Sequence, residues 1–209
     1  TETVVTGCPT TITRTYSIKD MAENEGTCTQ VITVEDKTAP ALTGTWPANI
    51  TGQNNCFANR NISGLLSTDS VKALYTDNCG GELTVDSSDV VTGDDCGWTV
   101  TRTYTIKDSC GNIVSPAPTM SVSGSDKTAP ALTGTWPANI TGQDNCLANR
   151  IISGLYSNDQ VKALYSDCSA LTVTSRDTVT GDDCGWTVTR TYTITDACEN
   201  SVTKTMSVS

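Results

Sequence analysis

The sequence predicts an all-β chain built from tandem repeats. Long segments recur, one recurring segment alternates strictly between two kinds of side chain, and glycine, asparagine, aspartate and proline interrupt these segments. The stretch DKTAPALTGTWPANITGQ at 36–53 returns letter for letter at 126–143. A catalytic site needs to be built only once, so this repetition indicates that length, spacing or multivalency is what the chain supplies.

Further matched segments define the bounds of the repeats. TGDDCGWTVTRTYTI at 92–106 returns unchanged at 180–194, and TMSVS follows it in both copies. We therefore predict two full repeats, 36–125 and 126–209. Residues 1–35 contain TITRTYSIKD, which aligns with TVTRTYTIKD of the first full repeat, and we interpret them as the C-terminal half of a preceding repeat.

The segment 98–107 predicts a β-strand with one buried face. Successive side chains of a strand point to opposite faces, and here one face is mostly apolar while the other carries threonines. The apolar face holds Trp98, Val100, Arg102, Tyr104 and Ile106. Arg102 is expected to lie along this face beside an aromatic ring. Repeats of about 90 residues with about seven short strands predict immunoglobulin-like β-sandwiches, arranged head to tail.

Composition argues against several classes of function. The chain has 13 Lys+Arg against 23 Asp+Glu, a net charge of −10 and no histidine. Nucleic-acid and anionic-membrane binding depend on basic surfaces, so neither partner is expected. No segment is apolar enough for membrane insertion. Without histidine the commonest general base and the usual nucleophile pairs are missing, so we do not expect an enzyme.

The ten cysteines indicate a secreted or cell-surface protein. They form no CxxC pair, so metal binding of the usual kind is not indicated, and disulfides in an oxidising compartment are expected instead. Cys96 and Cys110 flank one extended strand and therefore lie too far apart to bond to each other. Sandwich loops gather at two ends, and the loops that carry Cys56 and Cys96 are expected at one end and those that carry Cys79 and Cys110 at the other. Each repeat is therefore expected to bond its cysteines internally. The predicted pairs are Cys56–Cys96, Cys79–Cys110, Cys146–Cys184 and Cys168–Cys198.

The first two cysteines do not fit this scheme. Cys8 aligns with Cys96, and Cys28 lies beyond the same turn of the partial repeat. Their partners are expected upstream, in the half of the repeat that would precede residues 1–35, unless the two bond to each other.

Several of these strings together resemble a known family. DKTAP at 36–40, DNCG at 77–80 and RTYTIKDSCGN at 102–112 resemble HYR-like (hyalin-repeat-like) immunoglobulin-like modules, and the resemblance covers essentially the whole chain. The versions most similar to it occur in tandem in large secreted surface adhesins of Bacteroidota, including gliding-type adhesins. The resemblance implies an extended secreted stalk that serves cell adhesion.

The resemblance also implies a metal site at the junction between repeats. The DKTAP linker is similar to the acidic-then-proline junctions of calcium-rigidified stalks, and Ca²⁺ takes six to eight oxygen ligands. The alternative is that these aspartates cap turns and solvate loops. The aspartates expected around the junction are Asp94, Asp95, Asp126, Asp167 and Asp196.

The predicted function is a structural stalk or spacer of an extracellular adhesin or surface filament. Its partners are neighbouring copies of the repeat, with self-assembly into a filament as a variant. The alternative is a multivalent glycan- or protein-binding module, for which Trp46 and Trp136 would be exposed platforms rather than packed side chains. Ser70 and Thr178 lie in Asp-Ser/Thr-aliphatic strings that resemble a Bacteroidota O-glycosylation pattern.

Overall fold

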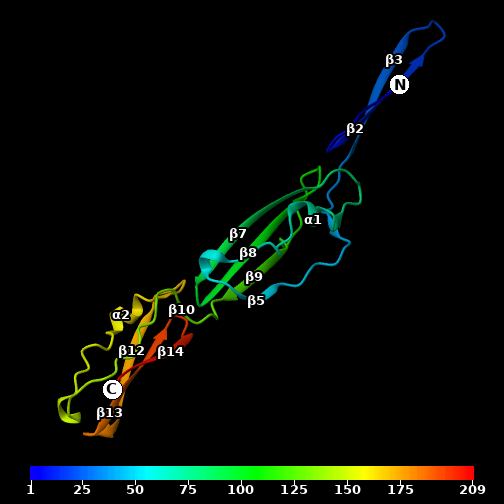
Figure 1. The fold of residues 1–209 in the computed structure, drawn as a ribbon. Coiled ribbons are helices and arrows are strands. Elements are labelled where there is room, and N and C mark those ends of the chain that lie inside the picture. Colours follow the sequence, from blue (N-terminus) through cyan, green and yellow to red (C-terminus); the bar gives the residue numbers. More distant parts are fainter. The chain divides into compact units, whose positions relative to one another are not determined.

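The computed structural model describes all residues 1–209, and its regular secondary structure is mostly β-strand (Figure 1). Its two α-helices, α1 (Thr68–Lys72) and α2 (Asn158–Lys162), each have five residues, and neither could cross a membrane. The all-β prediction is therefore confirmed. The chain folds into two compact units. One comprises 1–49, 63–90 and 100–121, and the other comprises 50–62, 91–99 and 122–209.

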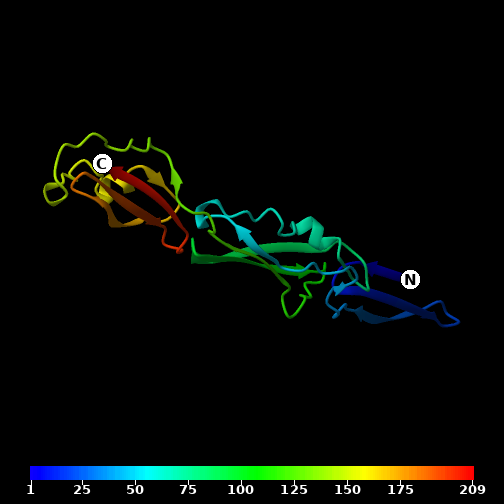
Figure 2. The same ribbon diagram turned by 60° about the horizontal axis from the view of Figure 1, so that its bottom comes forward.

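The N-terminal sheet consists of β1 (Glu2–Val5), β2 (Thr10–Lys19) and β3 (Glu25–Val34), which pair antiparallel in that order (Figure 1 and Figure 2). Large apolar side chains such as Ile18 and Val31 stay exposed here. A single three-stranded sheet has no second layer to bury them. This agrees with the interpretation of the segment as half of a repeat, although the predicted repeat bounds themselves remain a prediction.

The segment 36–125 contains six strands. Four of them form a sheet in the order β5-β9-β8-β7, and the short strands β4 and β6 pair with each other. The bounds are β4 (Ala41–Leu42), β5 (Ile50–Asn54), β6 (Tyr75–Thr76), β7 (Thr84–Asp94), β8 (Gly97–Lys107) and β9 (Thr119–Ser125).

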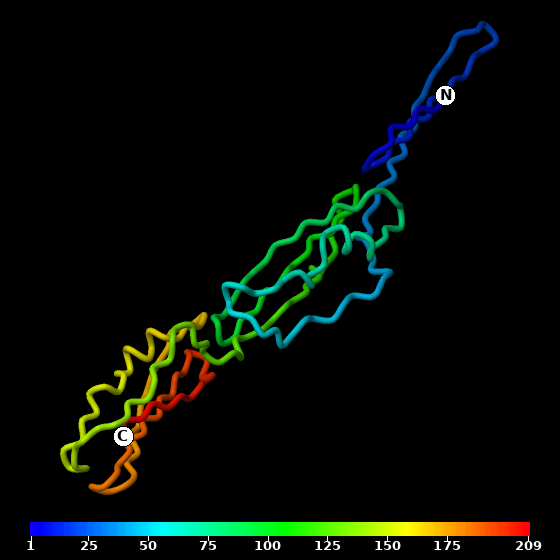
Figure 3. Tube along the Cα trace, viewed as in Figure 1, coloured from blue at the N-terminus to red at the C-terminus, as the bar shows by residue number.

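The segment 126–209 repeats this plan. Three strands form the sheet β12-β13-β14, β10 pairs with β11, and a parallel bridge from Ile140 to Val208 corresponds to the pairing of Ile50 with Val122. Figure 3 shows β13 and β14 side by side in orange and red. The bounds are β10 (Ala131–Leu132), β11 (Tyr165–Ser166), β12 (Thr172–Asp182), β13 (Gly185–Thr195) and β14 (Ser201–Val208).

Six and five strands are fewer than the roughly seven expected of an immunoglobulin-like sandwich. Between its strands each of these segments also forms a 3-10 turn, η1 (Phe57–Asn59) or η2 (Leu147–Asn149), and one of the helices α1 and α2. Both helices begin at a serine side chain that accepts a backbone N–H, at Ser67 and Ser157, which favours a helical turn over a strand.

The buried face of the long central strand agrees with its sequence pattern. In β8 the side chains of Trp98, Val100, Tyr104 and Ile106 are buried, and the intervening threonines are only half-buried. The corresponding residues of β13 belong to the core of the second segment. That core consists of Leu155, Val161, Tyr165, Leu171, Trp186, Val188, Tyr192, Ile194, Met206 and Val208.

Arg102 lies beside an aromatic side chain as expected, because its guanidinium and the Tyr104 hydroxyl donate to the same Leu66 carbonyl, but its main partner is a carboxylate. Its guanidinium binds both carboxylate oxygens of Asp89, each at 2.7 Å, and a third nitrogen donates to the Leu66 carbonyl at 3.3 Å. This hydrogen bonding holds the pKa of Asp89 below its usual value. Arg190 and Asp177 repeat the arrangement, with the same 2.7 Å distances. A two-pronged bond to a carboxylate satisfies a half-buried guanidinium better than stacking alone.

The two tryptophans considered as binding platforms are engaged within the fold. The Trp46 indole N–H donates to the Thr119 carbonyl at 3.1 Å, and its ring meets the edge of Tyr104 with centroids 5.6 Å apart. Trp136 makes the same two contacts, to Thr205 and to Tyr192. The packed interpretation of these residues is therefore the one that the structure supports.

Candidate functional site: the disulfide junction

The structure contains three disulfides, and each joins one predicted repeat to the next. Their Cα–Cα separations fall within the range that unstrained backbones allow. The bonds are Cys8–Cys110 at 5.1 Å, Cys56–Cys168 at 6.0 Å and Cys96–Cys198 at 4.9 Å. They indicate an oxidising environment, as the composition predicted.

The predicted pairing within each repeat is therefore wrong. Cys56, Cys96, Cys110, Cys168 and Cys198 all have other partners. The remaining predicted pair, Cys146–Cys184, is not formed, because both residues are free thiols.

The structure nevertheless brings Cys56 and Cys96 to one end of the first repeat, as the predicted pair requires. The Phe57 backbone N–H, next to Cys56, donates to the Asp95 carboxylate, next to Cys96, at 2.7 Å. The cysteines that bond to them at this end, Cys168 and Cys198, belong to the following repeat.

One signal in the sequence could have found the correct rule. Cys8 aligns with Cys96, and Cys110 aligns with Cys198. A bond from one repeat to the next must therefore span the same number of residues wherever it recurs in the array. The bonds Cys8–Cys110 and Cys96–Cys198 both span 102 residues. The expectation that Cys8 needs an upstream partner is therefore also wrong, because its partner lies downstream.

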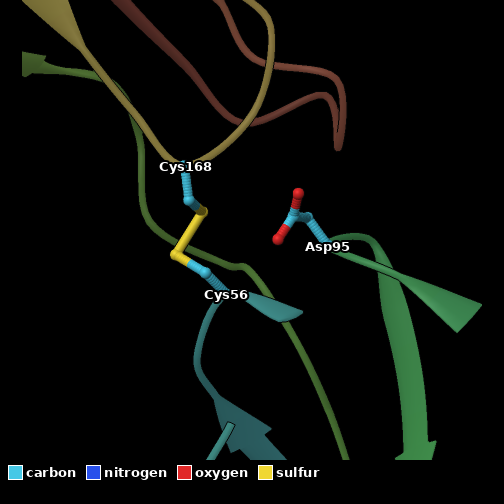
Figure 4. Close-up of side chains that lie close together, drawn as sticks. All are labelled: Cys56, Asp95 and Cys168. Carbon is cyan, nitrogen blue, oxygen red and sulfur yellow. A yellow bond between two sulfur atoms is a disulfide. The ribbon is translucent and has the colours of Figure 1, made fainter. Parts of the chain in front are cut away.

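Around the bonds, backbone groups tie the linker to the first repeat. The Asp126 N–H donates to the Asp95 carbonyl at 2.7 Å, and the Lys127 N–H donates to Asn54 Oδ1 at 2.9 Å. Figure 4 shows the Asp95 carboxylate facing the Cys56–Cys168 bond. Two disulfides and these hydrogen bonds together form what we call the closed junction.

Four cysteines are free and exposed: Cys28, Cys79, Cys146 and Cys184. Cys79 lines a hollow of about 380 Å³ together with the bonded Cys8 and Cys110, and with Asp36. Desolvation and the negative charge of Asp36 raise the pKa of the Cys79 thiol. We call this the half-closed junction, because Cys8–Cys110 is formed while Cys79, which aligns with the bonded Cys168, is free.

The five aspartates proposed for calcium do not all converge on one point. Asp94 accepts the Cys96 N–H at 2.9 Å, and Asp196 accepts the Cys198 and Asn200 N–H groups at 2.8 Å, so these two cap their own turns. Asp95 is engaged with the Phe57 N–H. The turn-capping interpretation therefore holds for Asp94 and Asp196, whereas Asp95 bonds a backbone group in a distant loop and lies close to Cys56 and Cys168.

Asp126 and Asp167 do come together. A carboxylate oxygen of each lies within 4.8 Å of the other and of Cys168 Sγ, and Asp126 is only 5% exposed. Burial first, and then the Asp126 charge, raise the pKa of Asp167. A cation between these two carboxylates would relieve their repulsion, so calcium remains a prediction that rests on two carboxylates rather than five. Asp36 and Asp77 form the same arrangement beside Cys79.

The two residues in glycosylation-like strings are both accessible. Ser70 is exposed in α1, where its hydroxyl lies 2.8 Å from that of Ser67. Thr178 is exposed on β12. Modification of either remains a prediction.

No protein-family model matches the chain, and no curated sequence matches it significantly.

Proposed function

We propose that this chain is a structural spacer of an extracellular adhesin or surface filament, whose disulfides make the array of repeats inextensible. The observation that carries the proposal is that every disulfide connects one repeat to the next. A disulfide within a repeat limits the extension of that repeat alone, whereas a disulfide between repeats transmits force along the array. The HYR-like resemblance points to the same role.

The bonds create a short covalent path between the chain ends. The path runs seven residues from Thr1 to Cys8, where the first disulfide leads to Cys110. It then returns fourteen residues along β8 to Cys96, where the second disulfide leads to Cys198. Eleven further residues reach Ser209. At about 3.4 Å per residue these roughly 32 steps reach about 110 Å, against about 700 Å for the fully extended chain without disulfides.

The longest part of this path is already extended. Between the two bonds the load follows β8, and a β-strand rises about 3.3 Å per residue, close to the maximum for a polypeptide. Pulling on the ends would therefore load a nearly taut strand, and the rest of the repeat would be bypassed. Cys56–Cys168 adds a second tie in parallel with Cys96–Cys198.

Force spectroscopy on the full chain tests this proposal. Pulled between residues 1 and 209, the oxidised chain should reach no more than about 110 Å, and the reduced chain should extend stepwise toward about 700 Å. A single Cys96→Ser variant is the matched intermediate, because it removes one bond of the path and leaves Cys8–Cys110 and Cys56–Cys168 in place. An oxidised chain that extends by several hundred ångströms contradicts the proposal.

The multivalent binding module remains the alternative function. It needs a repeated, accessible recognition surface, and the tryptophans that would form it are engaged with Tyr104 and Tyr192. Its extracellular ligand would have to be recognised elsewhere on the repeat. The proposed partners of the spacer are neighbouring copies of the same repeat.

A further inference from the structure

We propose that the face of the second repeat carrying Cys146 and Cys184 is a docking surface for a further copy of the repeat, which it binds through two disulfides. This face, here called the open face, is the counterpart of the surface of the first repeat that carries Cys56 and Cys96. The inference rests on the proposed array, because it names the partner that extends it.

The open face has the same local geometry as the surface in the closed junction. The Leu147 N–H donates to the Asp183 carboxylate at 3.0 Å, as the Phe57 N–H does to Asp95. The Cys184 N–H donates to Asp182 at 2.9 Å, the same distance as in the first repeat. Both free thiols are thus held on loops that already have the bonded arrangement.

The indole beneath each surface is anchored in the same way. The Trp186 N–H donates to the Asn145 carbonyl at 2.7 Å, and the Trp98 N–H donates to the Asn55 carbonyl at 2.9 Å. Trp98 is 1% exposed in the closed junction and Trp186 is 6% exposed at the open face. The underlying fold is therefore the same, and the difference lies in what covers it.

The open face also has room for a partner. A hollow of about 500 Å³ is lined by Asp144, Cys146, Asp183, Cys184 and Trp186, among others. In the closed junction the corresponding Asn54 accepts the Lys127 N–H and donates to the Thr128 hydroxyl at 3.4 Å. The Asp144 carboxylate can accept from both of these groups, and its charge complements the lysine of the linker.

The partner is defined by where its cysteines must lie. It needs one cysteine placed like Cys168 and a second placed like Cys198, both unbonded. The first repeat of a second chain does not offer this pair, because its Cys110 is bonded to Cys8 and only Cys79 is free. The geometry therefore points to a further repeat with both cysteines available.

Disulfide mapping of an extended chain tests this inference. A copy of residues 124–209 is appended after Ser209 of the full chain, with exposed Thr→Ser changes that give its cysteine peptides distinct masses. The protein is produced with an excess of a small-molecule disulfide as oxidant. Each new bond forms as two protein thiols lose two electrons and two protons, and the oxidant is reduced to two thiols. The disulfides are then assigned by mass spectrometry without reduction. We expect Cys146 to bond to the appended counterpart of Cys168, and Cys184 to the appended counterpart of Cys198.

A Cys184→Ser variant of the extended chain provides the second measurement. It should retain the Cys146 bond and leave one additional thiol, on the appended counterpart of Cys198. A bond between Cys146 and Cys184, or two free thiols at these positions while Cys56–Cys168 and Cys96–Cys198 are formed, overturns the inference and leaves the spacer proposal intact. Loss of Cys56–Cys168 and Cys96–Cys198 as well would remove the basis of both.

Discussion

The closed junction and the open face differ in their covalent state but not in their local structure. Cys56 and Cys96 are bonded, whereas Cys146 and Cys184 are free, yet the adjoining loops make the same hydrogen bonds in both places. The comparison teaches that each repeat builds its bonding surface by itself. The disulfides then determine which repeat is joined to this surface. They link repeats to one another, whereas the fold of the surface does not depend on them.

The largest expected effect comes from opening the closed junction. Replacing Cys96 and Cys198 together by serine removes a bond that spans 102 residues. An isolated loop of about 100 residues would contribute about 4.7 kcal/mol on the chain-entropy model, and the remaining Cys56–Cys168 bond reduces this, so we expect a loss of about 2–4 kcal/mol in unfolding free energy.

Denaturant unfolding monitored by tryptophan fluorescence measures this loss. Cys184→Ser is the matched control at the open face, and because that thiol has no partner its effect should stay within about 0.5 kcal/mol. If both variants lose the same stability, the distinction between the two surfaces is lost.

The Asp126–Asp167 pair of the closed junction allows the calcium prediction to be tested. If Ca²⁺ binds Asp126 and Asp167, a free Ca²⁺ concentration ten times the Kd should raise the free energy of unfolding by about 1.4 kcal/mol. The Asp126→Asn variant should show no such gain, and its stability should be unaffected by a chelator. Thermal unfolding with calcium and with chelator measures both, and an equal response of the two proteins argues against the site.

The Arg–Asp pairs provide a test in which the repeats should behave alike. Asp89→Asn and Asp177→Asn each remove a two-pronged bond whose side chains are 19% to 30% exposed, so we expect about 1 kcal/mol for each near pH 7. A clear difference between the repeats would show that their interiors, and not only their junctions, have diverged.

The contribution of the Arg102–Asp89 pair to the free energy of unfolding should decrease as the pH falls. The arginine holds the pKa of Asp89 below its unfolded value of about 3.9, so the folded state binds the proton more weakly. The stabilisation is therefore fully present above the unfolded pKa and is lost as the pH falls through the lower folded pKa. The difference between the parent chain and Asp89→Asn, measured by denaturant unfolding from pH 7 downward, should shrink over that window.

The smallest effect is expected at the half-closed junction. Desolvation and the Asp36 charge raise the pKa of Cys79, so little of the reactive thiolate is present at neutral pH. Asp36→Asn should lower this pKa and accelerate alkylation of Cys79 severalfold at fixed pH. Cys28 in the same molecule provides the reference rate, and an unchanged ratio of the two rates would exclude the charge effect.

Local features of this protein followed directly from its sequence. The alternation over 98–107 predicted both the strand β8 and its buried residues, because side-chain direction in a strand depends only on the pleat. The same strand fixed Cys96 and Cys110 at opposite ends. Recurrence of long segments revealed the repeated plan of strands.

The partners of those local features were decided only by the tertiary structure. Cys96 could have bonded to Cys56 of its own repeat, but it bonds to Cys198 of the next one. The strand pattern likewise gave no indication that Arg102 would bind Asp89. A disulfide requires Cα atoms about 4.4–6.8 Å apart, and the loops that satisfy this condition are 102 residues apart in the chain. Periodicity shows which way a side chain points, whereas the partner it meets depends on which surfaces the folded chain brings together.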